Sequence, residues 1–334
     1  MSEFALIERY FRRSEPTGGL VSVGIGDDCA LLTPDAGQQW AVSTDTLVEG
    51  VHFFPEVNPA TLGHKALAVN LSDLAACGAT PRCFFLAIAL PRVDQAWLDA
   101  FSRGLHALAD AYRCVLAGGD TTRSTAGVTI TITAIGTVPS SHALLRSGAR
   151  SGDDIWVSGE LGDAALGLAL RRDELKLSPL EAEQVLARLE KPAPRVHLGE
   201  RLRQIATSAI DVSDGLAGDL PHILRASGVG AVVEWPQIPR SWVLQQQPIQ
   251  MQQRCALGGG DDYELLFTAP IARRADVMRA AADGPDPIAV SRIGRIAATG
   301  GLAVLDEHGG RVETGMRSFD HFQDRPDLAN PSAS

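Results

Sequence analysis

The stretch ATLGHKALAVNLSDLAAC, residues 60–77, has the apolar spacing of a helix and contains few residues that break one. Gly78 follows it as a plausible helix stop. The residues around Asp73 in this stretch are almost all apolar or small, which indicates a helix packed on most of its sides. A carboxylate inside such a helix needs a partner, because an unpaired buried charge is costly.

Strand patterns lie on both sides of this helix in the sequence. The clearest is GVTITITAIGTV, whose strict alternation predicts a strand with one buried face. Helical periodicity returns over residues 95–112. The strands predicted in this half are WAVSTD (40–45), ending on Asp45, RCFFLAIAL (82–90), RCVLAGGD (113–120), in which a glycine turn follows the strand, and GVTITITAIGTV (127–138).

The stretch PSSHALLRSGARSGDD, residues 139–154, is rich in Ser, Gly and Pro and is the best candidate for a domain boundary. After it, strand and helix patterns alternate again, and Pro192 and Pro194 separate two helices. The sequence therefore predicts an α/β protein of two mixed domains, residues 1–140 and 148–322, followed by a loose tail, 323–334.

The composition narrows the classes of function. The chain has 334 residues and a formal net charge of -10, without a basic run, so nucleic acid is not an expected partner. No stretch is apolar for long enough to span a bilayer, and the N-terminus lacks the apolar core of a signal peptide. The five scattered cysteines indicate reduced thiols in a cytoplasmic protein.

Two distant stretches share one sequence pattern: glycines, an acidic pair, then apolar residues. They are GIGDDCALL (24–32) and GGGDDYELLF (258–267), and their likeness hints at a distant relation between the two halves. Each aspartate beside a glycine could equally be a turn residue or a helix N-cap. The aspartates at such junctions, with Asp73, are Asp27, Asp28, Asp45, Asp120, Asp211, Asp214, Asp261 and Asp262.

If several of these carboxylates converge, they repel one another by roughly 4 kcal/mol per pair ~4 Å apart at an effective dielectric of 20. The chain contains only Lys65, Lys176 and Lys191 as lysines, so the expected partners are arginines or metal ions. Oxygen ligands favour Mg²⁺ or Mn²⁺, and a cluster of Mg²⁺ ions suggests a polyphosphate. No Gly-Lys dipeptide, H-R-D or D-F-G is present, so a bound ATP would depend on metals rather than on a phosphate-binding lysine.

Taken together, the motifs resemble those of the thiamine-monophosphate kinase family, and the resemblance extends over about residues 1–322. This family belongs to the superfamily of aminoimidazole ribonucleotide synthetase and selenophosphate synthetase. The motifs, in chain order, are GIGDDCALL, STDTLVEGVHF, KALAVNLSDLAACGATP, LAGGDTTR, LLRSGARSGDDIWVSGELGDAALGL, AIDVSDGLAGDL and GGGDDYELLF.

The resemblance implies the two-domain architecture of that superfamily, an α/β (α+β) fold. The N-terminal domain would bind ATP and Mg²⁺ and pair with a second copy through a shared barrel, giving a homodimer. The C-terminal α/β domain would close over the nucleotide. The implied reaction is ATP-dependent phosphorylation of thiamine phosphate to thiamine diphosphate, the last step of its biosynthesis, assisted by several Mg²⁺ ions.

The resemblance also carries roles over to individual residues, of which Asp45, Asp73, Asp120 and Arg146 would be the catalytic set. The implied metal ligands are Asp28, Ser43, Thr44, Asp45, Asp73, Asp120, Asp211 and Asp214. The implied ATP contacts are Gly119, Asp120, Arg146 and Ser213. The implied thiamine phosphate contacts are His52, Asp261 and Phe319.

Two of these positions depart from the family pattern. Glutamate is common where this chain has Asp261, and Phe319 lacks the polar group of a tyrosine or tryptophan. Each residue also has a structural alternative: His52 as a packed histidine, Arg146 as a linker arginine, Phe319 as packing of the tail.

Because the acceptor is a phosphate monoester that is largely ionised at pH 7, no general base is required. We therefore expect direct in-line transfer by positioning and charge stabilisation.

Two other functions remain open at this stage. The chain could be another ATP-dependent synthetase of the superfamily, although no cysteine or lysine precedes GIGDD as in selenophosphate synthetases. It could also be a non-catalytic module that binds a nucleotide or a metal.

Overall fold

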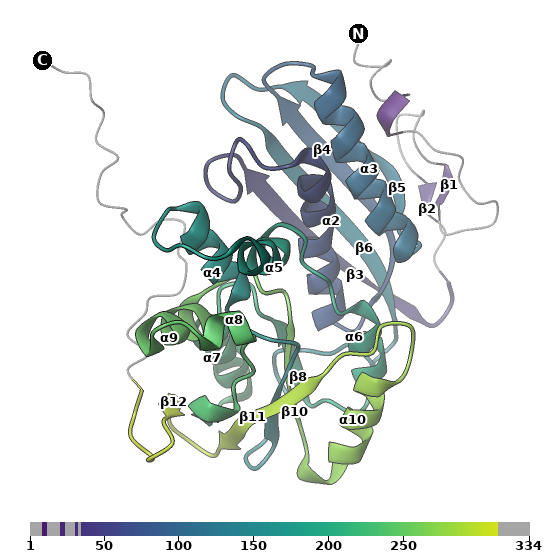
Figure 1. Cartoon of the computed structure of the whole chain (residues 1–334). Helices are drawn as coiled ribbons and strands as arrows, with labels where there is room; N and C mark the ends of the chain where they lie inside the picture. Colours follow the sequence, from purple (N-terminus) through teal and green to yellow (C-terminus); the bar gives the residue numbers. More distant parts are fainter. Residues whose placement is uncertain (1–8, 12–20, 24–30, 33–34, 313–334) are drawn as a thin grey trace, which may run out of the picture.

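The computed structural model describes residues 9–11, 21–23, 31–32 and 35–312. Two predicted site residues, Asp28 and Phe319, and the predicted tail lie outside this described part. Within it, two β-sheets lie on either side of the helix α2 (Pro59–Ala76), the stretch singled out in the sequence (Figure 1).

The first sheet has four strands in the order β3-β6-β4-β5. Neighbouring strands are antiparallel except β4 and β5, which are parallel and joined by α3 (Gln95–Ala111), the kind of crossover that a parallel pair requires. The strands are β3 (Gln38–Val48), β4 (Thr80–Leu90), β5 (Val115–Arg123) and β6 (Thr129–Pro139). A short antiparallel pair, β1 (Val21–Val23) and β2 (Leu31–Leu32), precedes them.

The two faces of this sheet follow from the alternating stretch that forms β6. Ile130 and Ile132 are fully buried in the core that includes α2 and α3, while Thr131 points to the opposite face. No helix of the described chain covers that opposite face (Figure 1), and on edge strand β3 the side chains of Trp40 and Val42 are 41% and 61% exposed. We refer to it below as the open face.

The helix α2 is buried on nearly its whole circumference, as the sequence predicts. Leu67 and Leu71 belong to one buried cluster with Ile132 of the first sheet and Phe267 of the second. The helix ends at Ala76, and Gly78 follows with a φ of 64°, which confirms the predicted stop. A helix that is apolar all round has to be covered on all sides, so α2 requires both sheets.

The second sheet has six strands in the order β12-β9-β11-β7-β10-β8. Its neighbouring strands are antiparallel, except β9 and β12, which are parallel. The strands are β7 (Asp154–Ser158), β8 (Ser208–Asp211), β9 (Gly230–Glu234), β10 (Leu265–Ala269), β11 (Val290–Ala297) and β12 (Leu302–Leu305).

Helices cover both faces of this second sheet (Figure 1). One face, with α6 (Val196–Leu202) and α10 (Arg274–Ala282), shares the buried cluster of α2. The other face packs against a second cluster formed with α4 (Asp163–Arg171), α5 (Pro179–Glu190), α7 (Leu216–Ser227), α8 (Trp242–Gln245) and α9 (Ile249–Gly258). Two short 3₁₀ turns, η1 (Trp235–Gln237) and η2 (Ile271–Arg273), complete the described elements.

Two strands extend beyond the limits that the sequence predicts. β3 continues past Asp45, and β5 runs straight through Gly119 and Asp120, where we predict a turn. The predicted turn is wrong because Gly119 serves a close contact instead. A Cβ on Gly119 would lie 1.8 Å from the backbone oxygen of Leu86 on β4, so no larger residue fits there.

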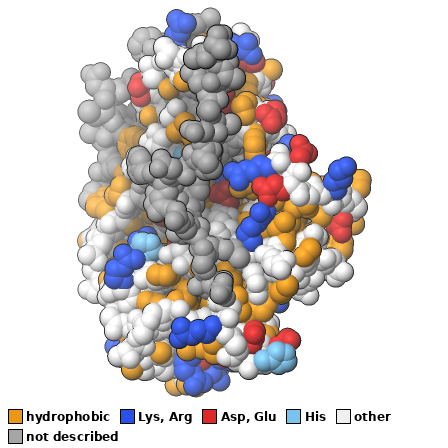
Figure 2. Space-filling model, turned by 90° about the vertical axis from the view of Figure 1, so that its left-hand side faces the viewer, with side chains coloured by type: hydrophobic (Ala, Val, Ile, Leu, Met, Phe, Trp, Pro, Cys, Tyr) orange, Lys and Arg blue, Asp and Glu red, His pale blue; other side chains and the backbone are white. Residues whose placement is uncertain are grey.

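Charged side chains are distributed widely over the surface. Figure 2 shows Lys, Arg, Asp and Glu side chains interspersed with apolar ones on the face that it draws. Of the helices that the structure describes, none combines the length and the apolar character that crossing a bilayer requires.

The contact between α2 and α3 depends on glycine. A Cβ on Gly104 would lie 1.8 Å from the backbone oxygen of Ala60, and one on Gly63 would lie 2.1 Å from that of Phe101. We predict that Gly104→Ala lowers the free energy of unfolding by about 1–3 kcal/mol, because two backbones have to move apart. Urea denaturation measures this. Gly301→Ala, where no atom lies within 4 Å of the added Cβ, is the control and should change stability by less than about 0.5 kcal/mol.

Candidate active site

Three aspartates from three different elements face one another beside α2. Asp45 lies on β3, Asp73 in the last turn of α2 and Asp211 at the end of β8. On β3, Asp45 shares the α2-facing side of the first sheet with Ile132, its partner on β6. We call these three residues the acidic cluster. It joins the two sheets, because two of its members come from the first half of the chain and one from the second.

Two carboxylates of the acidic cluster, Asp45 and Asp211, are harder to ionise than free aspartates. Burial and the Asp73 carboxylate raise the pKa of Asp45 to about 7, and burial and the same neighbour raise the pKa of Asp211 to about 7. Hydroxyl groups contact two members of the cluster: Ser43 donates to Asp73, and Ser72 donates to Asp211 at 2.7 Å. Because a hydroxyl carries no compensating charge, the arrangement favours the addition of a cation.

The loop after β8 carries Ser213 and Asp214 into the site and is held by a residue that the sequence reasoning missed. Asp219, near the start of α7, accepts hydrogen bonds from the backbone N–H of Ser213 at 3.0 Å and of Asp214 at 2.9 Å. Burial raises the pKa of Asp219 to about 7. The spacing D-x-x-x-x-D within VSDGLAGD was the available signal, because an acidic residue early in a helix often binds free backbone amides.

The carboxylates of the second acidic pair in the sequence, Asp261 and Asp262, contact different partners. Asp262 accepts hydrogen bonds from the backbone N–H of Gly162, at the start of α4, at 2.9 and 3.1 Å. Asp261 faces the other way, with its Oδ2 2.9 Å from Nζ of Lys65 and its Oδ1 3.0 Å from the hydroxyl of Tyr263. Asp262 is therefore a helix cap, whereas Asp261 reaches the site.

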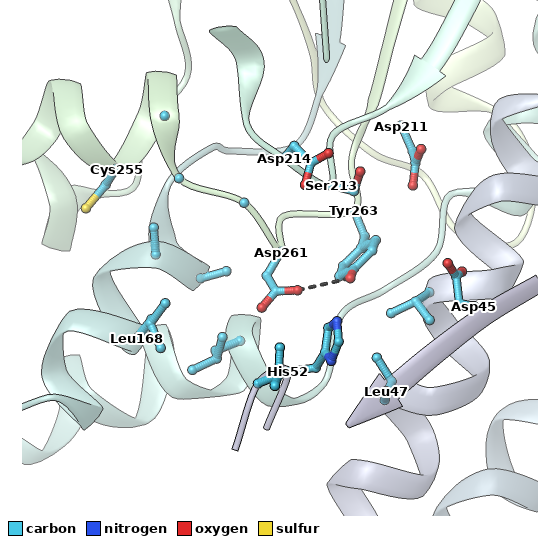
Figure 3. Close-up of a pocket in the computed structure, with 18 of the residues that line it drawn as sticks. Asp45, Leu47, His52, Leu168, Asp211, Ser213, Asp214, Cys255, Asp261 and Tyr263 are labelled. Carbon is cyan, nitrogen blue, oxygen red and sulfur yellow. Dashed lines mark hydrogen bonds between the residues drawn. The ribbon is translucent and has the colours of Figure 1, made fainter. Parts of the chain in front are cut away.

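His52 lies beside this turn, after the end of β3. Its Nδ1 accepts a hydrogen bond from the backbone N–H of Val48 at 3.0 Å. A neutral His52 consequently carries its proton on Nε2 and can donate it. Figure 3 draws His52 and Tyr263 on the wall of the larger pocket, with Tyr263 between Asp261 on one side and Asp45 and Asp211 on the other.

Two pockets meet at the acidic cluster. The larger has a volume of about 790 Å³ and the smaller about 660 Å³, and both are lined by Asp73 and Asp211. Of the predicted site residues, the larger pocket also contains Thr44, Asp45, His52, Ser213, Asp214 and Asp261, and the smaller contains Ser43 and Arg146. Two ligands could therefore approach the same carboxylates from different sides.

Asp120 lies far from the acidic cluster within one chain. It is on β5, at the opposite edge of the first sheet from β3, and three strand spacings amount to about 14 Å. Its successive cross-strand neighbours, Ala87, Thr131 and Thr46, put it on the open face, whereas Asp45 points to α2. Asp120 can therefore approach an acidic cluster only if that cluster belongs to a second copy of the chain.

One more of the predicted residues lies on the open face. The Thr44 hydroxyl lies 2.9 Å from that of Thr133, on the side of the sheet away from Asp73. Gly119, the residue before Asp120, has Leu86 and Ile132 as its cross-strand neighbours and therefore lies on the side that faces α2. The predicted site is thus divided in one chain between the two pockets and the open face.

The oxygen ligands of the acidic cluster fit a hard divalent cation. Among the described residues, no three His, Cys, Asp or Glu side chains stand close enough together to hold one ion between them. Mg²⁺ does not need such a cage, because it is usually held by one or two carboxylates and completes its shell with waters and phosphate oxygens. The mutual repulsion of Asp45, Asp73 and Asp211 also favours the binding of a divalent cation.

Two family models match the chain. The model described as "AIR synthase related protein, N-terminal domain" matches residues 26–138, and the one described as "AIR synthase related protein, C-terminal domain" matches residues 150–307. They span the first and the second sheet respectively. The fold is thus that of a two-domain AIR synthase related protein.

Relatives at higher identity define the family within that class. The thiamine-monophosphate kinase of Escherichia coli (strain K12) is 45% identical over 324 residues, which are 96% of this chain and 98% of the relative. The crystal structure of thiamine-monophosphate kinase from Stenotrophomonas maltophilia K279a has 44% identity and a TM-score of 0.81, with 86% of this chain and 92% of that chain covered. The structure "AaThiL complexed with AMPPCP and TMP" has 30% identity and a TM-score of 0.72, with 84% and 87% covered. The chain belongs to the thiamine-monophosphate kinase family, as its motifs predict.

One expectation from the sequence is wrong. We expected arginines or metals, not lysines, as the partners of site carboxylates, yet Lys65 is buried and forms an ion pair with Asp261. The signal was present in the helical stretch, since Lys65 is the one lysine inside an otherwise apolar helix. Tyr263 was missed for a similar reason, because an aromatic residue beside an acidic pair resembles a core residue.

The raised pKa values predict that the metal-free protein loses stability as the pH rises. Unfolded aspartates lose their protons near the ordinary pKa of 3.8, whereas folded Asp45 and Asp211 keep theirs up to about 7. In this interval the folded state binds more protons, so the free energy of unfolding falls with increasing pH. Urea unfolding in a chelating buffer measures the slope. Asp45→Asn should make it shallower, and equal slopes for both proteins would contradict the prediction.

Proposed function

We propose that this enzyme transfers the γ-phosphoryl group of ATP to thiamine monophosphate and forms thiamine diphosphate. The observation that carries the proposal is the pair of pockets that share Asp73 and Asp211, because a donor and an acceptor phosphate could meet there. The similarity to thiamine-monophosphate kinases, one of them described in complex with AMPPCP and TMP, supports the choice of substrates.

We assign the acceptor to the larger pocket. His52 would donate from Nε2, and Asp261 would contribute a carboxylate held by Lys65 and Tyr263. Apolar side chains such as Leu168 give the rings of thiamine a surface to pack against (Figure 3). The predicted contact from Phe319 lies outside the described residues and remains a prediction.

We assign the nucleotide to the smaller pocket. Arg146 lies on its wall and would place a fixed positive charge beside the phosphates. Leu145, which is largely exposed, offers apolar surface for a base. Ser213, in the loop held by Asp219, would contact the phosphates near the acidic cluster.

The acidic cluster would hold Mg²⁺ together with the predicted ligands Ser43 and Asp214 of the same chain and Asp120 of the partner subunit. Asp28, outside the described residues, and Thr44, whose hydroxyl lies on the open face, remain predictions. When bound, Mg²⁺ would neutralise the phosphates of both substrates and reduce their repulsion. The three carboxylates of the acidic cluster come from β3, α2 and the end of β8, so binding would also fix the two sheets relative to each other.

The residues themselves would act mainly by positioning. The acceptor phosphate is largely ionised at pH 7, so His52 has to orient it rather than remove a proton. The approach of two substrates from different sides of Asp73 and Asp211 favours direct in-line transfer. No covalent phospho-enzyme is required.

We further propose that the enzyme is a homodimer in which the open faces of two first sheets meet. This pairing would cover Trp40 and Val42 and allow Asp120 and Gly119 of one copy to approach the site of the other. The position of Asp120, on the opposite face from Asp45, is the observation that favours a shared site.

We predict that ADP is released when thiamine monophosphate is added with ATP and Mg²⁺, and much more slowly with thiamine or with no acceptor.

Asp45→Asn should lower kcat at least about a hundredfold, because it removes charge that holds the metal in the transition state. Asp99→Asn, on the exposed side of α3, is the matched control and should keep the wild-type rate. A chelator should abolish turnover in the wild type, and excess Mg²⁺ should restore it.

Near-normal turnover of Asp45→Asn at saturating Mg²⁺ would contradict the assigned role of the acidic cluster. Radioactive phosphate that stays on the quenched protein would contradict direct transfer.

We predict that two inactive variants complement each other. In a mixed dimer of Asp45→Asn and Asp120→Asn, one site combines both defects and the other is wild type. An equal mixture of freely exchanging subunits should therefore recover about a quarter of the wild-type rate. Mixed dimers isolated by co-expressing differently tagged subunits and purifying through both tags should show about half of the wild-type rate, because one of their two sites is intact. Isolated mixed dimers as inactive as the parent variants would contradict a shared site.

A further inference from the structure

Lys65 is a buried cation to which the proposed chemistry assigns no direct contact with a substrate. It lies on α2 with its side chain 5% exposed, whereas Lys176 and Lys191 are exposed. Burying an ammonium group is costly unless the charge is paired, and its carboxylate partner is Asp261, 2.9 Å away. The two residues are 196 positions apart, so the pair joins the two halves of the chain.

The turn that carries Asp261 is strained and has to be held in place. Asp261 and Tyr263 have φ values of 69° and 51°, in the left-handed region that side chains other than glycine rarely adopt. Backbone hydrogen bonds tie the turn to the loop after β8: the N–H of Asp261 donates to Ser213 at 2.9 Å, and that of Tyr263 donates to Val212 at 2.8 Å. The side-chain contacts with Lys65 and Tyr263 then determine where the Asp261 carboxylate points.

Both oxygens of Asp261 are engaged, yet the group stays accessible. Lys65 contacts Oδ2, the Tyr263 hydroxyl donates to Oδ1 at 3.0 Å, and the Asp261 side chain is still 31% exposed. Asp261 and Tyr263 line the larger pocket, while Lys65 itself does not. Lys65 thus contacts the carboxylate from outside the larger pocket, whereas Asp261 itself lies on the pocket wall (Figure 3).

We propose that Lys65 is a positioning residue for the acceptor: it holds the Asp261 carboxylate, with Tyr263, at a fixed place in the larger pocket. The carboxylate would meet the cationic or amino-bearing rings of the acceptor rather than its phosphate, since like charges repel. This inference rests on the proposed function. Because Lys65 and Asp73 lie on one helix, about 12 Å apart along its axis, α2 would set the distance between the acceptor ring and the acidic cluster.

The test is Lys65→Met, which keeps the aliphatic volume and removes the charge. We expect KM for thiamine monophosphate to rise about ten- to a hundredfold, the usual loss for a hydrogen bond to a charged group, with KM for ATP within about twofold of the wild type. Lys176→Met, at an exposed lysine, is the matched control and should change neither constant. Equal rises of both KM values, or none, would overturn the role of Lys65.

A double-mutant cycle separates positioning from a general loss of structure. If Lys65 acts through Asp261, adding Lys65→Met to Asp261→Asn should raise KM for the acceptor no further, whereas multiplicative effects would overturn the proposal. Tyr263→Phe removes one hydroxyl only and keeps the test available if Lys65→Met does not fold. Tyr263→Phe should raise the same KM severalfold, and an unchanged KM would contradict the proposal that Lys65 and Tyr263 position the Asp261 carboxylate.

Calorimetric binding of thiamine monophosphate to the wild type distinguishes a failure of the proposed function from a failure of the inference about Lys65. A wild-type protein that neither binds nor phosphorylates this compound contradicts the proposed function. A wild type that does both, beside a Lys65→Met variant with unchanged acceptor affinity, overturns the inference about Lys65 alone.

Discussion

The repulsion among Asp45, Asp73 and Asp211 is the constraint on which the rest of the site depends. Two charges about 4 Å apart repel by roughly 4 kcal/mol even at an effective dielectric of 20. The fold keeps them together by taking each from a separate, well-packed element: an edge strand, a helix buried on all sides and the end of a strand in the second sheet. Carboxylates that repel one another in the absence of ligand favour the binding of cations, and the bound cations can in turn bind a polyanion.

The doubled aspartates of the sequence find a physical explanation in the second pair. One residue of that pair, Asp262, stabilises the first turn of α4, and the other, Asp261, turns towards Lys65 and the larger pocket. Adjacent carboxylates are tolerated because they point in different directions and meet different partners. A structural residue thus anchors its functional neighbour, and Gly260, just before them, lets the turn approach Ser213 closely.

Much of the fold follows from local pattern, since the buried helix and the alternating strand have periods that a sequence reveals. The position of Asp120 on the open face does not follow from local pattern. One extra residue in β5, opposite the bond between Phe84 and Phe85, shifts the register and turns Asp120 to the open face. The pairing of Lys65 with Asp261 is equally hidden, because it depends on two sheets meeting across α2. Motif resemblance identified the family, and most of the residues that it implies line one of the two pockets, but it revealed neither of these two facts.

The close contact of α2 with α3 has a consequence for how this enzyme can change over evolutionary time. Glycine at Gly63 and Gly104 lets the two backbones touch and fixes α2 against the first sheet. A single residue inserted between Lys65 and Asp73 would rotate one end of the helix by about 100° relative to the other. An insertion in a surface loop would leave that relation intact, whereas an insertion in this one helical segment would separate the orientation of Lys65 from that of Asp73.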